Sequence, residues 1–205
     1  MSIGRLHIIT DTRPGRDAYG LALAALEAGA PVIQVRGKDL ADRELYELAN
    51  RVAEACAKHG AQCIVNDRVH VALAVGAGAH VGDDDLPVDV ARRVLGSDAV
   101  LGATARNPVT AQAHEVAGAS YLGVGPCYGT STKAGLPTAI GLPGLRAVVD
   151  AVDVPVIAIA GVTAERVPEL LAAGAHGVAV VDAVSSAEHP QRAVEALLAA
   201  LETRP

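Results

Sequence analysis

The chain has 205 residues, of which 51% are hydrophobic, and it carries a formal net charge of -6 at pH 7. This length fits one domain, residues 1–205, and the acidic charge argues against nucleic-acid binding, which needs a basic face. We expect a cytoplasmic protein, because we find no signal peptide, no apolar run of the roughly 20 residues that a membrane helix needs, and no CxxC pair among the three cysteines.

The chain alternates regularly between strand-like and helix-like segments. In chain order, the predicted strands are residues 6–10, 31–36, 62–66, 79–81, 100–103, 121–125, 156–160 and 177–181. Segments with helical spacing separate them, for example residues 19–28 and 42–58. A glycine suited to the left-handed helix terminator follows four of the helical segments: Gly29, Gly60, Gly118 and Gly174.

Eight strand–helix units in this length predict an α/β fold, a (β/α)8 TIM barrel that forms a single domain. An open doubly wound sheet has the same alternation, but the first strand lacks the GxGxxG turn of its dinucleotide-binding form. Because Phe and Trp are absent and only four Tyr occur, we expect a core of Val, Ile, Leu and Ala, which suits the layers inside a parallel barrel.

Polar side chains cluster where the second, third and fourth predicted strands end. Gln34 and Arg36 share one side of their strand, and Lys38 follows on the loop, so that the three side chains form a candidate anion clamp. Asp67 and Asp85 follow the next two strands. These carboxylates could form ion pairs with the basic residues or hold Mg2+ with water and phosphate oxygens. Each run taken alone is equally compatible with a solvated strand end or loop.

Further polar loops follow the last three strands. Residues 125–135 contain hydroxyls, glycines and Lys133, a composition that can wrap a phosphate and that also occurs in flexible surface loops. Gly161 follows the seventh strand, and Val181 and Asp182 follow the eighth. Phosphate frequently binds between these two loops in TIM barrels. The Asp182 carboxylate would repel a phosphate unless it turns away.

These runs together resemble thiamine-phosphate synthase over nearly the whole chain. The matching pieces are the QxRxK run at 34–38, Asn66-Asp67, the HxGxxD-like run that ends in Asp85, and Gly125-Pro126 leading into residues 130–133. The resemblance implies a transferase of thiamine biosynthesis. Such an enzyme joins 4-amino-2-methyl-5-hydroxymethylpyrimidine diphosphate to 4-methyl-5-(2-hydroxyethyl)thiazole phosphate and releases pyrophosphate.

The resemblance also implies roles for individual residues. The residues expected to bind the diphosphate are Gln34, Arg36, Lys38, Asn66 and Lys133. Mg2+ would be held by Asp67 and Asp85, while Thr104 stands where the family usually has Ser near the pyrimidine and the leaving group. The residues expected around the thiazole phosphate are Thr130, Thr132, Gly161, Val181 and Asp182. The expected catalytic residues are Lys133, Thr104 and Arg36.

Four positions depart from the usual family pattern. Asp83 stands in place of a common Gln, Arg106 in place of a frequent His, Ala160 in place of the first Gly of a Gly-Gly pair, and Asp182 in place of a common Ser. The last two lie at the expected thiazole-phosphate site, so the match to the family pattern is weaker there than at the diphosphate site.

Two other functions are compatible with the same barrel. A related thiazole tautomerase works without metal and generally lacks the Asn-Asp and Thr-x-Thr-Lys runs, which this chain keeps. A non-catalytic thiamine-precursor binding protein would keep the pocket without turnover. No catalytic triad is evident, and we interpret His80 and His114 as structural. Relatives of this kind are commonly dimers, so the resemblance also allows a homodimer.

Overall fold

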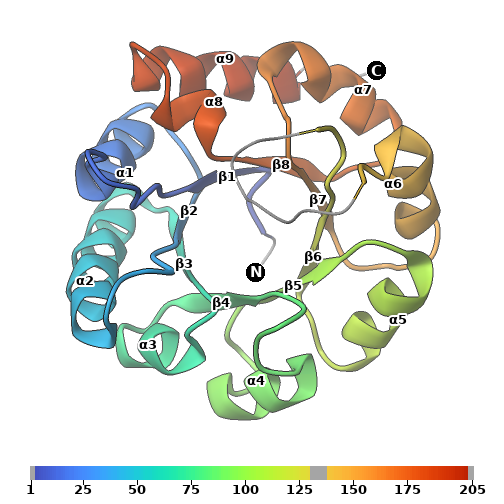
Figure 1. Cartoon of the computed structure of the whole chain (residues 1–205), viewed down its shortest axis with the longest axis horizontal. Helices are drawn as coiled ribbons and strands as arrows, with labels where there is room; N and C mark the ends of the chain where they lie inside the picture. Colours follow the sequence, from blue (N-terminus) through green and yellow to red (C-terminus); the bar gives the residue numbers. More distant parts are fainter. Residues whose placement is uncertain (1–2, 130–137, 203–205) are drawn as a thin grey trace.

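The computed structural model describes residues 3–129 and 138–202, which form a closed barrel of eight parallel strands surrounded by helices (Figure 1). Neighbouring strands pair in chain order, and the eighth strand pairs with the first. The predicted α/β fold, a (β/α)8 barrel, is therefore confirmed.

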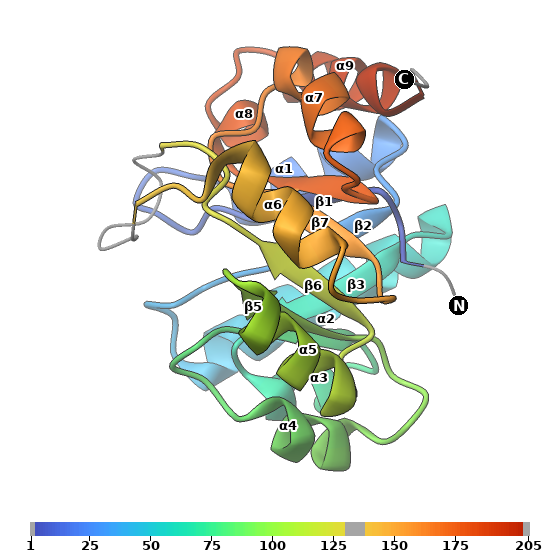
Figure 2. The same ribbon diagram turned by 90° about the vertical axis from the view of Figure 1, so that its right-hand side faces the viewer.

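Each predicted strand agrees with the structure to within two residues at both ends. The strands are β1 (Leu6–Ile9), β2 (Val32–Val35), β3 (Gln62–Asn66), β4 (Gly78–Val81), β5 (Leu101–Ala105), β6 (Tyr121–Val124), β7 (Val156–Ile159) and β8 (Gly177–Val180). The helices are α1 (Ala18–Glu27), α2 (Asp42–His59), α3 (Val69–Ala74), α4 (Val88–Leu95), α5 (Pro108–Val116), α6 (Gly141–Val149), the 3-10 helix η1 (Ala164–Arg166), α7 (Val167–Ala172), α8 (Asp182–Ser185) and α9 (Pro190–Glu202). Figure 2 shows α5, α6 and α7 covering one side of the strands.

Local capping chemistry determines where several helices begin and end. The four glycines expected to terminate helices all adopt φ angles between 67° and 99°: Gly29, Gly60, Gly118 and Gly174. At the start of α1 the Asp17 side chain accepts a hydrogen bond of 2.9 Å from Gly20 N, and at the start of α5 Asn107 accepts one of 2.9 Å from Thr110 N. These contacts satisfy backbone donors that the helix itself leaves unpaired.

Apolar side chains pack on both sides of the strands. Ile8, Val35 and Leu122 belong to the cluster shared with the helices, and that cluster consists mainly of Val, Ile, Leu and Ala, as predicted. A smaller cluster fills the barrel interior and includes Ile64 and Ile157. Within the described ranges we find no helix with the length and apolar character needed to cross a membrane.

The expectation of an aliphatic barrel interior is wrong at four positions. Polar or aromatic side chains are buried there: His7, Gln34, His80 and Tyr121. Two glycines leave the space for these rings, since a Cβ at Gly102 would lie 2.2 Å from the Tyr121 ring and a Cβ at Gly123 would lie 2.9 Å from the His80 ring. The composition of the whole chain could not reveal these positions, because composition does not tell which side chains the strands turn toward the barrel interior.

Candidate active site

A cavity of about 580 Å³ is lined by residues from the carboxyl ends of all eight strands. Every predicted site residue that lies in the described ranges lines this cavity: Gln34, Arg36, Lys38, Asn66, Asp67, Asp85, Thr104, Gly161, Val181 and Asp182. The predicted residues Thr130, Thr132 and Lys133 lie outside the described residues. The cavity occupies the position in which TIM barrels build their active sites.

The end of β2 supplies cations to this cavity. Gln34 is buried within the strand, and Arg36 and Lys38 follow it along the same wall. The Arg36 backbone N–H donates a hydrogen bond of 2.9 Å to the Thr10 hydroxyl, which holds this segment against the end of β1. Lys38 Nζ lies 3.5 Å from Asp67 Oδ2. The predicted anion clamp is therefore assembled next to one of the predicted metal-binding carboxylates.

Asp67 and Asp85 approach each other at the ends of β3 and β4. Burial and a side-chain hydrogen bond with Asp85 raise the pKa of Asp67 from 3.8 to about 6. Asp85 Oδ2 also accepts a hydrogen bond of 2.7 Å from Gly82 N, which fixes its loop. The Asp67 backbone has a φ of 65°, a left-handed conformation that aspartate tolerates better than most residues. Two carboxylates this close need a proton or a cation between them.

The carboxylate pair fits a divalent cation such as Mg2+. Mg2+ commonly takes one or two carboxylates and completes its octahedron with water and phosphate oxygens. Across the described residues, we find no group of three or more His, Cys, Asp or Glu side chains that could hold a metal ion. A cation held by Asp67 and Asp85 would therefore depend on further oxygens from water and a phosphate compound, and Arg36 and Lys38 line the same cavity.

Buried polar side chains form the floor of the cavity. His80 Nδ1 lies 3.0 Å from the Tyr121 hydroxyl, and His80 Nε2 lies 3.0 Å from Thr104 Oγ1. Gln34, buried in β2, favours the ionised form of the Tyr121 hydroxyl, an effect smaller than that of burial on its pKa. Burial lowers the pKa of His80 from 6.5 to about 4 and raises the pKa of Tyr121, so both rings are neutral near pH 7. His80, which we interpreted as structural, thus contacts the predicted site residue Thr104.

An arginine from the start of the chain neutralises the Asp182 carboxylate. Arg13, in the connection between β1 and α1, forms ion pairs with both Asp11 and Asp182. Its hydrogen bonds lower the pKa of Asp11 to about 2. The repulsion expected between Asp182 and a phosphate is therefore reduced. Sequence reasoning missed Arg13 because 169 residues separate it from its partner.

The loop after β7 holds two consecutive residues in the left-handed region. Gly161 has a φ of 67°, and a Cβ there would lie 2.7 Å from Tyr128 Cβ and 2.8 Å from Gly129 O, so the position requires glycine. Ala160 has a φ of 75°, a conformation that costs a non-glycine residue about 1–2 kcal/mol. Arg166 stacks over the Tyr128 ring, 4.4 Å from its centroid, and adds a cation to this wall that the sequence did not reveal.

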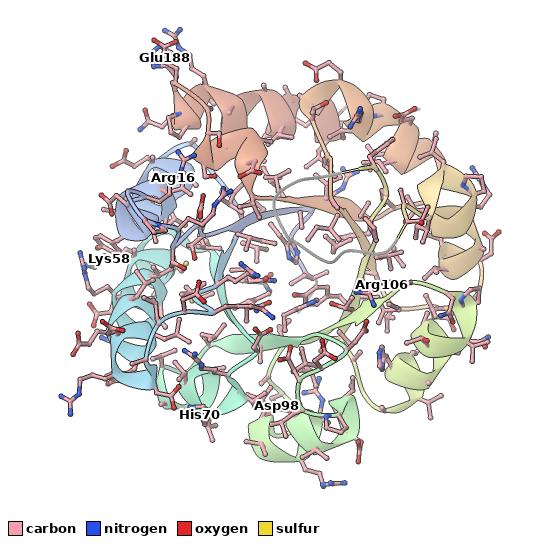
Figure 3. The ribbon with its side chains drawn as sticks, viewed as in Figure 1. Arg16, Lys58, His70, Asp98, Arg106 and Glu188 are labelled. Carbon is pink, nitrogen blue, oxygen red and sulfur yellow. The ribbon has the colours of Figure 1, made fainter. Side chains whose placement is uncertain are left out.

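Two of the departures from the family pattern form an ion pair with each other. Arg106 after β5 binds Asp83 in the connection between β4 and α4, and both line the cavity. In Figure 3, Arg106 lies inside the ring of helices, whereas Lys58 and Glu188 lie at the periphery. The ion pair ties the loop that carries Asp85 to the end of β5. The two substitutions are therefore complementary in charge.

Comparison with known proteins agrees with this geometry. Residues 6–184 match the family described as "Thiamine monophosphate synthase". The chain belongs to this family. The family resemblance predicted from the run of motifs between positions 34 and 133 is therefore confirmed.

Similar family members cover nearly the whole chain. The thiamine-phosphate synthase of Salinispora arenicola is 60% identical over 204 residues, which are 98% of each chain, and that of Salinispora tropica is 58% identical with the same coverage. The solved structure of thiamine phosphate pyrophosphorylase from Pyrococcus furiosus is 37% identical and superimposes with a TM-score of 0.89, covering 97% of this chain and 95% of that chain. A 3-hexulose-6-phosphate synthase at 19% identity and a TM-score of 0.70 shares the barrel fold.

Proposed function

We propose that this member of the thiamine monophosphate synthase family is a transferase that joins the pyrimidine diphosphate to the thiazole phosphate and releases pyrophosphate. The observation that carries this proposal is the meeting of Asp67 and Asp85 with Arg36 and Lys38 in one cavity, since this set suits a metal-bound diphosphate. Two relatives named thiamine-phosphate synthase, at 58% and 60% identity, support it. The proposed catalytic unit is the whole chain, residues 1–205, as one domain.

The pyrimidine diphosphate binds on the side of the cavity formed by β2 to β5. The residues that hold the diphosphate are Gln34, Arg36, Lys38, Asn66 and Lys133. Asp67 and Asp85 hold Mg2+, which supplies charge neutralisation to the diphosphate oxygens when it is bound. The close approach of these two carboxylates supports this assignment, because a divalent cation relieves their repulsion.

The thiazole phosphate binds on the side formed by the connections after β6, β7 and β8. The residues that hold its phosphate are Thr130, Thr132, Gly161, Val181 and Asp182. Asp182 takes part through its backbone, because its carboxylate is paired with Arg13. Arg166, which lines the same wall, adds positive charge that suits a phosphate.

The chemistry needs charge stabilisation more than it needs a nucleophile. The bond between the pyrimidine methylene carbon and the diphosphate oxygen breaks with its electron pair on oxygen, and the amino group of the pyrimidine donates electrons into the cation that forms. Arg36, Lys38 and Lys133 stabilise the negative charge on the departing oxygens. The thiazole nitrogen then supplies the electron pair of the new carbon–nitrogen bond. Thr104 positions the pyrimidine from the cavity floor.

Incubation with both substrates and Mg2+, followed by mass detection of thiamine phosphate and a pyrophosphate-release assay, tests this function. Asp67→Ala and Lys133→Ala are each expected to abolish synthesis while the far-ultraviolet spectrum stays unchanged, because both residues belong to the polar site. Asp98→Ala, at an exposed carboxylate, is the matched control. Normal turnover by either site variant would refute its role.

Metal removal separates the synthase from the tautomerase. EDTA is expected to stop pyrophosphate release and added Mg2+ to restore it, because Asp67 and Asp85 act through the cation. Unchanged turnover of thiazole precursor in EDTA would favour the tautomerase instead. A non-catalytic binder would take up thiazole phosphate in calorimetry yet release no pyrophosphate with both substrates present.

The proposed partners are these two small anionic molecules, with no nucleic acid and no membrane. The homodimer stays a prediction that sedimentation analysis can test. The cytoplasmic location stays a prediction that cell fractionation can test.

A further inference from the structure

We propose that Arg68, in the connection between β3 and α3, is a positioning residue that holds the backbone of Lys38 in place for an anion bound in the cavity. Arg68 acts through Lys38 and does not touch the substrate. That the anion is a diphosphate rests on the proposed function. The contact between Arg68 and the backbone of Lys38 belongs to the protein itself and can be tested without substrate.

The Arg68 guanidinium bridges the connection between β2 and α2 and the first turn of α2. Its Nη1 donates a hydrogen bond of 3.5 Å to Gly37 O, and its Nη2 donates one of 3.3 Å to Lys38 O. Its Nε lies 3.2 Å from Asp42 Oδ1. All three nitrogens of one planar group thus meet oxygens of the segment 37–42. Arginine suits this arrangement because its donors stand in a fixed fork, whereas lysine offers one ammonium group.

The side chain of Lys38 cannot hold its own loop while substrate is bound. Lys38 Nζ lies 3.5 Å from Asp67 Oδ2, and the Lys38 side chain is 46% exposed. In the proposed function both members of this ion pair have other partners, since Lys38 binds the diphosphate and Asp67 a cation. The ion pair is then given up. Arg68 binds the backbone of Lys38, so its contact persists when the Lys38 side chain turns toward the anion.

Arg36, two residues earlier, has an anchor of its own. Its backbone N–H donates a hydrogen bond of 2.9 Å to Thr10 Oγ1, and the Thr10 hydroxyl donates one of 3.3 Å to Arg36 O. The segment is therefore fixed to β1 at Arg36 and to the connection after β3 at Lys38. Because these anchors are separate, loss of the Arg68 side chain should affect Lys38 much more than Arg36.

The surroundings of Arg68 favour positioning over direct binding of an anion. In the part of the chain that the structure describes, Lys38 and Asp67 line the main cavity and Arg68 does not. Arg68 lines a smaller cavity of about 320 Å³, beside Lys38, Asp67 and Asp85. Its three nitrogens already bind the protein. The Asp42 side chain is 65% exposed, so this ion pair adds little to stability and Arg68→Met should fold.

Hydrogen–deuterium exchange of the metal-free, substrate-free protein tests the anchor itself. Backbone amides of residues 36–41 are expected to exchange faster in Arg68→Met than in the wild type, because the connection opens locally more often. Arg93→Met is the matched control, since it removes an exposed ion pair between Arg93 and Asp89 on α4. It should leave exchange in this segment unchanged. Unchanged exchange in Arg68→Met would overturn the proposal.

Steady-state kinetics test whether the anchor serves the anion. Arg68→Met is expected to raise the KM for pyrimidine diphosphate on the order of ten- to a hundredfold, the scale of a misplaced binding group, and to leave the KM for thiazole phosphate unchanged. Arg68→Lys should resemble Arg68→Met, because it keeps the charge and loses the fork. A wild-type KM in Arg68→Lys, or an equal rise of both KM values in Arg68→Met, would overturn the proposal.

Calorimetry with Mg2+ and inorganic pyrophosphate tests the route through Lys38. If Arg68 acts through Lys38, the variant carrying both Arg68→Met and Lys38→Met should lose no more affinity than Lys38→Met alone. Losses that multiply would show that Arg68 acts independently and would overturn the proposal. A wild type that forms no thiamine phosphate would overturn the proposed function, and the exchange and pyrophosphate measurements would still decide the role of Arg68.

Discussion

Replacing Asp67 by asparagine should stabilise the metal-free protein while it abolishes turnover. Burial and the Asp85 carboxyl raise the folded-state pKa of Asp67 from 3.8 to about 6, so ionisation of Asp67 at pH 7 opposes folding. A shift of about 2 pKa units corresponds to about 3 kcal/mol of unfolding free energy. The attraction of Lys38 is already part of this balance. Because the Asp67 side chain is 21% exposed, we expect about 1–3 kcal/mol.

The stabilisation has a defined pH dependence. Since the folded-state pKa of Asp67 lies above its unfolded value, the folded protein binds more protons between about pH 4 and pH 6, and the contribution of Asp67 to stability falls as the pH rises through this range. Asparagine does not titrate. The difference between variant and wild type should therefore be largest above pH 7 and vanish below about pH 4. Asparagine also tolerates the φ of 65° at this position.

Thermal unfolding in EDTA measures this effect. At pH 8 the Asp67→Asn variant should unfold about 2–12 °C above the wild type, because 1 kcal/mol shifts Tm by about 2–4 °C in a chain of this size. The variant should also lose the stabilisation that Mg2+ gives the wild type. Asp98→Asn, at the exposed residue labelled in Figure 3, is the control. A Tm for Asp67→Asn at or below that of the wild type at pH 8 would refute the reasoning.

Three further predictions follow from named contacts. Ala160→Gly should raise the free energy of unfolding by up to about 1 kcal/mol, because Ala160 has a φ of 75°. Denaturant unfolding measures this, and a lower midpoint in the variant would contradict it. Arg13→Met should raise the KM for thiazole phosphate more than that for pyrimidine diphosphate, because it leaves the Asp182 carboxylate without Arg13, and adding Asp182→Ser should restore the KM for thiazole phosphate. Equal changes in both KM values would count against this role of the Arg13–Asp182 ion pair. Burial lowers the pKa of His7 to about 3 and that of His80 to about 4, both below the ordinary value of 6.5. As the pH drops, the unfolded state therefore takes up protons before the folded state does. The free energy of unfolding of the wild type should fall between about pH 6.5 and pH 4. These two shifts together outweigh the opposite effect of Asp67, and a pH-independent denaturant midpoint in this range would show that the two rings are not buried in the neutral form.

The barrel could be predicted from local features of the chain. The ends of β3, for example, were predicted without error. Strand segments differ from helices in side-chain period and in β-branched content, and these signals do not depend on distant residues. Gly60 ended α2 where the pattern placed a left-handed terminator. Alternation then implied a parallel sheet, since parallel strands need crossover helices, and the eight units in this length together with the missing GxGxxG turn favoured the closed form.

Part of the site followed from the same logic. Gln34, Arg36, Asp67 and Asp85 all come at or just after strand ends, and a closed parallel barrel brings every such end to one rim. Position within a strand was therefore enough to predict that these side chains meet. Lys133, predicted from its motif, lies outside the described residues and stays a prediction.

The amino-acid sequence by itself determined the order of strands and helices, the rim on which polar residues gather and the family, because periodicity, capping and motif spacing are local properties. Only the tertiary structure decided which side chains bind one another, as in the pairing of Arg13 with Asp182 and the contact of His80 with Thr104 and Tyr121. Such partners are set by barrel closure and by the space that glycines leave between strands, and both depend on residues far apart in the chain.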